Sequence, residues 1–313
     1  MVELRESAAE AVSQTPAKKK RSFRKWRGLL YITPWLIGFF VFQFGPLLAS
    51  FGYSFTNYNM MSAPKFVGLK NYIQLFTADP EFVKSLTATL TYACISVPAK
   101  LIFALFVAYI LNFKLKGVNF YRTVYYMPSI LGGSIAISAL WKLLFMKEGI
   151  INGLLSAINI GPVDWLGTPG TAMIVICLLQ VWQFGSSMVL FLAALKQIPA
   201  ELYEAAEIDG GSKVKQFFKI TLPMITPIVF FNLVMQSINA FQDFTAAFII
   251  TNGGPLKSTY LIGMKLYDEG FRNFKMGYAC AISWVLFAII LLFTLLVFRS
   301  SDAWVYYEDG GDF

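Results

Sequence analysis

The sequence predicts an all-α membrane protein, and three observations support this prediction. Hydrophobic residues make up 57% of the chain and charged residues 14%, with a mean hydropathy of +0.58, which is unlike a soluble domain. Six apolar segments are each long enough, at about 20 residues, to cross a bilayer. Between the fourth and fifth segments lies a polar stretch with helical periodicity, which predicts a two-helix loop outside the bilayer.

The predicted spans cover residues 29–53, 86–111, 121–145, 171–195, 224–250 and 276–299. The first is too long for a cleaved signal peptide, and Gly45-Pro46 inside it predicts a kink. We therefore expect three parts: a basic tail at 1–28, a six-helix transmembrane domain at 29–300 and a C-terminal tail at 301–313.

The basic residues predict the orientation of these spans. With a cytoplasmic N-terminus, the cytoplasmic side holds sixteen Lys and Arg residues, eight of them in the tail, and the outer side holds nine. Because basic residues concentrate on the cytoplasmic side, we expect a multi-pass protein of the cytoplasmic membrane with both termini inside. This sorting and contact with lipid headgroups explain the net charge of +8, so no nucleic-acid partner is expected.

The loop at 199–222 falls on the cytoplasmic side in this orientation. In its first half, Leu202, Ala205 and Ala206 form a small apolar helix face beside glutamates three residues apart. Gly210-Gly211 then interrupts the helix, and Ser212 can cap a second one. We expect a short helix, a glycine turn and a second helix, which together form a compact shape that a partner protein can bind.

Most catalytic chemistry is absent from the sequence. There is no histidine, which excludes imidazole catalysis and most zinc sites. Cys94, Cys177 and Cys280 fall in three different spans without metal-ligand spacing, and we interpret them as small core residues. No G-x-x-x-x-G-K-[ST] phosphate loop and no serine in a nucleophile-elbow context occurs. We expect a protein that is not an enzyme and holds no metal or cofactor of its own.

Polar residues inside the spans are candidates for a solute path, because polar groups at this depth usually face the interior of a helix bundle. In the fifth span, Gln236, Asn239 and Asp243 recur along one helix face, and such amide and carboxylate groups suit sugar hydroxyls. The other candidates are Gln180, Gln183, Phe184 and Ser187 in the fourth span, and Ser129, Gly133 and Ser134 after an expected helix break at Pro128 in the third. Alternatively, these groups hydrogen-bond one helix to another.

Lys100 is a second charged residue within the spans, and three roles stay open for it. It snorkels toward the membrane surface, pairs with Asp243, or lines a cavity. Counting residues from the outer ends places the two residues at depths that differ by roughly 12 Å, at about 1.5 Å per residue. This difference argues against a direct pair.

The loop resembles the coupling-loop signature of the membrane subunits of bacterial ATP-driven importers, which reads E-A-A, then D-G, then F-x-x-I-x-L-P. The matching residues are Glu204, Ala205, Ala206, Asp209, Gly210, Phe217, Ile220, Leu222 and Pro223. The one departure is Gly211, where alanine is more usual. FVGLKNY at 66–72 and TNGGP at 251–255 resemble the first of the two dissimilar membrane subunits of carbohydrate importers of the maltose type. The resemblance covers residues 29–300 and implies the type I ABC importer permease fold in a compact six-span form.

This resemblance also implies function and partners. It implies the translocation subunit of an importer for an oligosaccharide or related sugar. The partners would be a second six-span permease subunit, two ATPase subunits that bind Mg-ATP, and an extracellular solute-binding protein. The alternative is a self-sufficient secondary sugar carrier. A carrier does not need a cytoplasmic two-helix loop, and it usually has internal repeats, which we do not find.

The resemblance finally implies a sugar site. In the maltose importer, this type of subunit binds the sugar halfway across the membrane. Local alignment transfers the contacts to Ser129, Gly133, Gln183, Phe184, Ser187, Asn239, Ala240 and Asp243. The residue types differ from those of the maltose importer, so we expect a different sugar.

Overall fold

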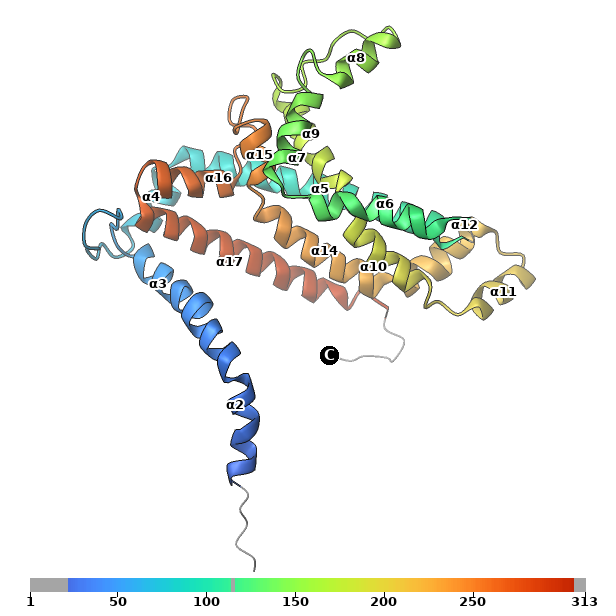
Figure 1. Ribbon diagram of the computed structural model, residues 1–313, viewed down its shortest axis with the longest axis horizontal. Coiled ribbons are helices and arrows are strands. Elements are labelled where there is room, and N and C mark those ends of the chain that lie inside the picture. The colour runs from blue at the N-terminus through green and yellow to red at the C-terminus, as the bar shows by residue number, and fades with distance from the viewer. Residues whose placement is uncertain (1–21, 114–115, 307–313) are drawn as a thin grey trace, which may run out of the picture. The chain divides into compact units, whose positions relative to one another are not determined.

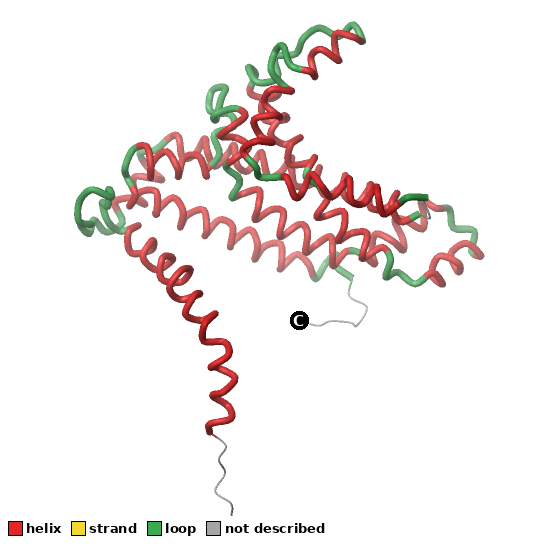
Figure 2. The backbone as a smooth tube through the Cα atoms, in the orientation of Figure 1, coloured by secondary structure: helices red, strands yellow, loops and turns green. Residues whose placement is uncertain are grey.

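The computed structural model describes residues 22–113 and 116–306, with side chains from residue 31 onward, and the described chain is helical (Figures 1 and 2). Within those ranges the only β-type pairing is an isolated bridge between Thr56 and Phe66. This confirms the all-α prediction. The chain divides into two compact units, Met1–Gly52 and Tyr53–Phe313.

The first unit contains one long apolar helical stretch. It consists of α2 (Ser22–Phe39), a π-helical turn (Phe40–Phe44) and the start of α3 (Gly45–Ser54). Residues Tyr31–Ser54 are long and apolar enough to cross a membrane. The irregularity expected at Gly45-Pro46 is this π-helical turn just before it, where the Gly45 N–H bonds to the Phe40 carbonyl. Helix α2 begins inside the predicted tail, of which residues 1–21 lie outside the described residues.

The second unit holds the remaining helices, labelled in Figure 1. They are α4 (Lys70–Thr77), α5 (Pro80–Asn112), α6 (Val118–Leu131), α7 (Ile135–Leu144), α8 (Ile150–Ala157), α9 (Pro169–Trp182), α10 (Gly185–Leu195), α11 (Ala200–Ile208), α12 (Lys213–Gln216), a π turn (Phe217–Thr221), α13 (Leu222–Met224), α14 (Thr226–Phe241), α15 (Thr245–Ile250), α16 (Ile262–Tyr267), a second π turn (Asp268–Arg272) and α17 (Met276–Ser301).

Straight and bent helices together account for most of the predicted spans. Tyr31–Ser54, α5 and α17 each pass the length and hydropathy test for a span. Three bent pairs raise the number to six if each pair is one span: α6 with α7 at 103°, α9 with α10 at 47°, and Lys213–Met224 with α14 at 65°. Five of the six predicted segments correspond to these helices, two of them as bent pairs. The fifth, 224–250, covers α14 and α15, whereas the third bent pair joins α14 to Lys213–Met224, most of which lies in the predicted loop.

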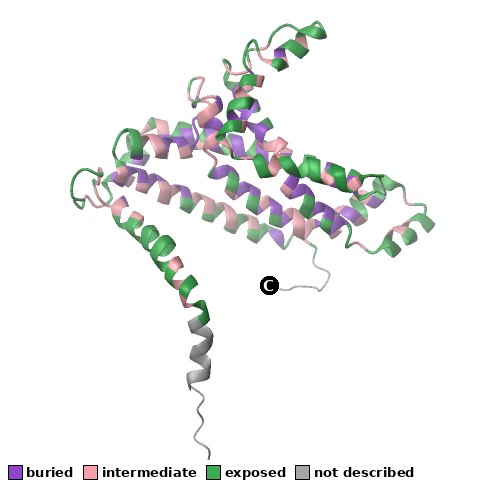
Figure 3. Cartoon of the chain, in the orientation of Figure 1, coloured by how far each residue is buried: buried purple, intermediate pink, exposed green. Residues whose placement is uncertain are grey.

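Helix α5 is the centre of the second unit and packs against α9, α10 and α14. Its first turn is well defined, because Asp79 accepts hydrogen bonds from the N–H groups of Glu81 and Phe82 and Pro80 occupies the first helical position. Buried residues concentrate along α5, α9 and α14, whereas α8 and α11 are mostly exposed (Figure 3). A small residue is required where α10 meets α6, since a Cβ at Gly185 would lie 2.7 Å from the Tyr126 Cα atom.

A cluster of charges joins the start of α5 to α16 and α17; we call it the Lys265 cluster. The Lys265 side chain is 1% exposed, and its Nζ lies 2.7 Å from Asp79, 3.5 Å from Glu269 and 3.9 Å from Glu81. The Tyr278 hydroxyl donates to Asp79 at 2.6 Å. Burial raises the pKa of Asp79, but the hydrogen bonds from Lys265 and Tyr278 outweigh it and leave the pKa below its ordinary value.

Two predicted helix features are wrong in position. Pro128 lies inside α6, and the break comes later, at Gly132–Ser134, where Gly133 has a φ of +76° and Ser134 caps α7. The fifth span does not continue as one helix through Asp243, because α14 ends at Phe241. Asp243 therefore follows the end of the helix that carries Gln236 and Asn239, and the three do not form a stripe on one helix.

The cysteines are only partly core residues. Cys177 is buried and Cys280 is half-buried, but Cys94 is exposed on α5, so the core interpretation is wrong for Cys94.

Candidate functional site

A polar pocket of about 370 Å³ lies where three helical segments are interrupted; we call it the central pocket. The interruptions are Gly132–Ser134 between α6 and α7, Gln183–Phe184 between α9 and α10, and Gln242–Phe244 between α14 and α15. The lining residues are Tyr92, Lys100, Gly132, Gly133, Ser138, Leu179, Gln180, Gln183, Gln236, Asn239, Asp243, Thr245 and Ala246. Irregular backbone inside apolar segments is tolerated where it lines a cavity, which is the situation here.

Tyr92, Asp243 and Lys100 are the ionisable side chains of this pocket. Tyr92 is fully buried on α5, and its hydroxyl donates a short hydrogen bond to Asp243 Oδ2. Lys100, two helical turns along α5, is 5% exposed and makes no ion pair with any described residue. Of the three roles left open for Lys100, the structure shows the cavity-lining one.

The expectation that Lys100 and Asp243 do not pair directly is confirmed, since no ion pair in the described part of the chain joins them. Both line one pocket, although residue counting separated them along the membrane normal. The counting assumed an unbroken fifth helix, and the break after Phe241 invalidates that assumption.

Four of the eight residues transferred from the maltose importer line the central pocket: Gly133, Gln183, Asn239 and Asp243. They come from all three interruptions or the helix ends beside them. The pocket thus brings together side chains from three predicted spans.

The other four transferred residues do not line the pocket. Ser129 donates to the Gln183 carbonyl and accepts from the Ser186 N–H, both at 3.0 Å, which ties α6 to the α9–α10 junction. Phe184 is 5% exposed and packs edge-on against Phe103, with ring centroids 4.8 Å apart. Ser187 and Ala240 are fully buried. The Ser129 hydroxyl therefore hydrogen-bonds one helix to another, which was the alternative to a contact with the solute.

Sequence reasoning missed three polar lining residues, Tyr92, Ser138 and Thr245, and the apolar or small residues Gly132, Leu179 and Ala246. For Tyr92 a signal was present. Tyr92, Ser96 and Lys100 recur every four residues on the apolar helix α5, so they share one face, and all three are buried. Ser138 and Thr245 had no comparable signal, because each stands on a short helix that begins after a break.

The two-helix loop (199–222) forms as predicted, from α11 and α12 followed by the first π turn. It lies at the end of the second unit opposite α4 and α16 (Figure 1). Helix α11 ends in a glycine turn in which Gly210 has a φ of +73° and the Gly211 N–H bonds to the Ala206 carbonyl at 2.7 Å. Ser212 caps α12 by accepting from the Lys215 N–H.

The signature residues of this loop fall into two groups. Glu204, Ala205, Asp209 and Gly210 are exposed, whereas Ala206, Phe217, Ile220 and Pro223 are half-buried. The loop also presents apolar side chains to the outside, since Ile208 is 87% exposed and Val214 68%.

Contacts at the base of the loop hold it to the helix bundle. The Tyr203 and Thr221 hydroxyls lie 2.8 Å apart, which joins α11 to the π turn. Phe217 packs edge-on against Tyr109 of α5, with ring centroids 5.1 Å apart. Lys213 pairs with Glu207 across the glycine turn, and this hydrogen bond keeps the pKa of Glu207 below its ordinary value. Of these contacts, only the one between Phe217 and Tyr109 joins the loop to another helix of the bundle, α5.

Gly211, the one departure from the signature, is fitted closely into the turn. A Cβ at this position would lie 2.8 Å from the Ala206 carbonyl oxygen. Alanine at position 211 would thus require the turn to shift. Replacing Gly211 by the alanine that is usual in the signature would therefore disturb the loop more than the similar size of the two residues suggests.

Comparisons with known proteins agree with this geometry. Residues 75–305 match the family described as "Binding-protein-dependent transport system inner membrane component". A "Probable ABC transporter permease protein YesP" of Bacillus subtilis is 48% identical over 296 residues, covering 93% of this chain and 96% of that protein. The "Trehalose/maltose transport system permease protein MalF" of Thermococcus litoralis is 34% identical over 275 residues, covering 87% and 92%.

A solved structure confirms the fold. A chain of a bacterial ABC transporter involved in the import of the acidic polysaccharide alginate superimposes with a TM-score of 0.77 at 23% identity, covering 90% of this chain and 96% of that chain. At this identity the likeness concerns the fold alone. The fold and the family implied by the loop signature are confirmed, and the alternative of a self-sufficient carrier is not supported. This chain therefore belongs to the family of inner-membrane components of binding-protein-dependent transport systems, as a permease subunit of an ABC transporter.

Proposed function

We propose that the solute of this importer permease is an oligosaccharide or related sugar and that it passes through the central pocket. The observation that carries the proposal is the polar lining of this pocket inside an apolar helix bundle. Four amide side chains, Gln180, Gln183, Gln236 and Asn239, face one cavity, and amides both donate to and accept from hydroxyl groups. The trehalose/maltose permease among the relatives supports a carbohydrate as the solute.

The solute contacts proposed are Gly133, Gln183, Asn239 and Asp243, all on the pocket wall. Ser129, Phe184, Ser187 and Ala240 do not line the pocket; Ser129 and Phe184 join neighbouring helices, and Ser187 and Ala240 are buried. A pocket of about 370 Å³ falls in the range of about 300–1,000 Å³ that is usual for small-molecule sites, so one or a few sugar units would fit at a time.

The chain would work within a larger assembly. Besides the solute-binding protein, the proposed partners are a second six-span permease subunit and two ATPase subunits that bind Mg-ATP. The chain itself would be non-catalytic, which agrees with its lack of a phosphate loop. The excess of basic residues in the N-terminal tail and in the loop supports cytoplasmic termini and a cytoplasmic two-helix loop.

The two-helix loop would couple the ATPase to the pocket. Its exposed face carries Glu204, Asp209 and Ile208, a mixture of charged and apolar groups that suits a protein cleft. Closure of the ATPase pair would move the loop, and through it α10 and α14, which directly precede and follow it. Helix α10 begins at one of the breaks that line the central pocket, and α14 ends at another. Movement of these two helices would therefore open the pocket to one side of the membrane at a time.

The test is solute uptake by the complete transporter in proteoliposomes, with Asn239→Ala and Asp243→Ala in this chain. Removing a polar partner costs about 1–3 kcal/mol, so uptake should fall by about fivefold to 150-fold. Stimulation of the ATPase by the loaded binding protein should persist, because that signal does not pass through the pocket side chains. Asn119→Ala, at an exposed position on α6, serves as the matched control. Loss of assembly or of thermal stability with an unaltered solute preference would contradict the proposal and favour a role in holding helices together.

A further inference from the structure

The central pocket contains a buried cation without a partner. Lys100 is 5% exposed and its side chain lines the pocket. In the described part of the chain, no carboxylate, carbonyl or hydroxyl oxygen accepts a hydrogen bond from its Nζ, and no ion pair includes it. A lysine ammonium has three N–H donors and no acceptor, and a buried charge is costly unless an opposite charge or hydrogen-bond acceptors surround it.

Asp243 is the one carboxylate of the pocket lining, and it is already engaged. Its Oδ2 accepts the short hydrogen bond from the fully buried Tyr92 hydroxyl. The negative charge of Asp243 is thus anchored at the α14–α15 break, and it offsets the charge of Lys100 only from a distance.

The rest of the lining is neutral. Gln180, Gln183, Gln236 and Asn239 contribute amides, and Ser138 and Thr245 contribute hydroxyls. These groups match sugar hydroxyls, but none supplies an anion to Lys100. The pocket therefore offers neutral partners on most of its wall and a free cationic position on α5.

We propose that the solute carries an anionic group, which binds the Lys100 ammonium while its hydroxyls contact the amides. This inference rests on the proposed function, because it specifies which class of sugar the pocket takes. A bound carboxylate or phosphate supplies the counter-ion that Lys100 lacks. A neutral sugar leaves the ammonium buried with only hydroxyl oxygens as acceptors, which is the weaker pairing.

The experiment measures uptake by the complete transporter, with its binding protein, in proteoliposomes. Two kinds of anionic probe distinguish the source of the charge: trimers of galacturonate, glucuronate and mannuronate, and hexose 6-phosphates. The matched neutral probes are the methyl esters of the same uronate trimers and the free hexoses. Each pair differs in charge and little in shape, so the comparison isolates the anionic group.

Three variants separate charge from fold. Lys100→Met removes the cation, Lys100→Arg keeps it, and Lys84→Met removes an exposed lysine four turns away on the same helix. We expect Lys100→Met to lower uptake of the anionic probe by about tenfold or more while changing uptake of a neutral probe by less than about twofold. Lys100→Arg should retain most of the anionic uptake, and Lys84→Met should match the unaltered protein. Co-purification with the other subunits, and ATPase stimulation by the loaded binding protein, show that each variant is assembled.

The outcomes are distinguishable. If Lys100→Met loses uptake of the uronates or of the hexose phosphates but keeps uptake of the matched neutral probe, the inference is supported and the anion is identified. Two results overturn the inference and leave the proposed function standing. In one, the unaltered complex transports only neutral sugars; in the other, Lys100→Met lowers uptake of the anionic probe and of its neutral match equally. Transport of none of these sugars by the unaltered complex would overturn the proposed function as well.

Discussion

Replacing Lys265 by methionine should destabilise the second unit strongly, because it removes the cation from a buried group of carboxylates. The methionine keeps most of the apolar length of the side chain, so the change isolates the charge. Asp79 and Glu269, 12% and 13% exposed, would lose their buried cation, and only the Tyr278 hydroxyl would remain for Asp79 and the exposed Lys275 for Glu269. Glu81 contributes little, because it is 44% exposed and 3.9 Å from Lys265 Nζ.

The magnitude follows from this burial. Removing one partner of a buried ion pair costs about 3–5 kcal/mol, and the partial exposure of both carboxylates favours the lower end. A loss of about 3 kcal/mol corresponds to a decrease of about 6–10 °C in the apparent melting temperature. The assay is thermal unfolding of the detergent-solubilised protein, followed by intrinsic tryptophan fluorescence at a fixed heating rate.

A matched control is provided by Lys275, whose Nζ lies 3.6 Å from the same Glu269 but whose side chain is 57% exposed. Lys275→Met should lower stability by no more than about 1 kcal/mol, because exposed ion pairs contribute little. If Lys265→Met and Lys275→Met lowered the melting temperature equally, burial would not be what makes the Lys265 cluster stabilising, and the reasoning would be refuted.

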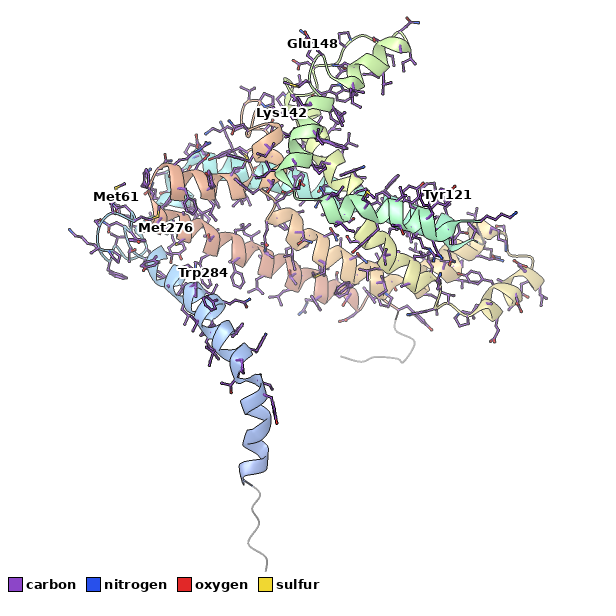
Figure 4. The ribbon with its side chains drawn as sticks, viewed as in Figure 1. Met61, Tyr121, Lys142, Glu148, Met276 and Trp284 are labelled. Atoms are coloured by element: carbon purple, nitrogen blue, oxygen red, sulfur yellow. The ribbon has the colours of Figure 1, made fainter. Side chains whose placement is uncertain are left out.

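Two further predictions concern pH and the loop. The pKa of Asp79 lies below its ordinary value of 3.8 in the folded protein, so its stabilising contribution is complete above that value and is lost as the pH falls below it. The melting-temperature advantage of the unaltered protein over Asp79→Asn should therefore be constant from about pH 5 to 7 and shrink below about pH 4. An advantage at pH 3 as large as that at pH 6 would contradict the assignment. In the loop, Gly210→Pro should abolish uptake without preventing membrane insertion, because proline cannot adopt the φ of +73° at this position. Glu204→Lys should also abolish uptake if this exposed residue faces the ATPase. The control Glu148→Lys, between α7 and α8 and away from the loop, should leave uptake unchanged (Figure 4). Normal transport by both Gly210→Pro and Glu204→Lys would count against coupling through this loop.

The helical elements could be predicted because their signals are local. A span requires about 20 apolar residues in sequence, and the glycine turn at Gly210 requires a residue that accepts a positive φ. Both properties are visible in a short window of the chain. The two-helix loop and its Ser212 cap therefore agree with the structure, and so do three of the apolar segments as single helices and two as bent pairs.

The positions of the helix breaks were harder to predict. Pro128 looked like the break in the third span, yet it lies inside α6, and the chain turns at Gly132–Ser134 instead. A proline removes a single N–H donor, and neighbouring groups in a membrane helix can compensate. The break instead coincides with glycines that line a cavity, and the presence of a cavity is a property of the packed molecule.

The candidate site shows the same division. The sequence by itself indicated which polar residues lie inside the spans, because polar groups are rare and costly there. Only the tertiary structure decided which of them share the central pocket: Asn239 and Gln183 line it, whereas the Ser129 hydroxyl is used between helices.

What the sequence determined about this protein is its class: an all-helical membrane chain with a two-helix loop of a known family. The tertiary structure decided which distant residues come together, such as Lys100 and Asp243 in the lining of one pocket and Asp79 beside Lys265 in one cluster. The physical reason is that hydropathy and turn chemistry act within a few residues. Rotation of each helix about its axis, and the point at which it breaks, depend instead on packing against all its neighbours.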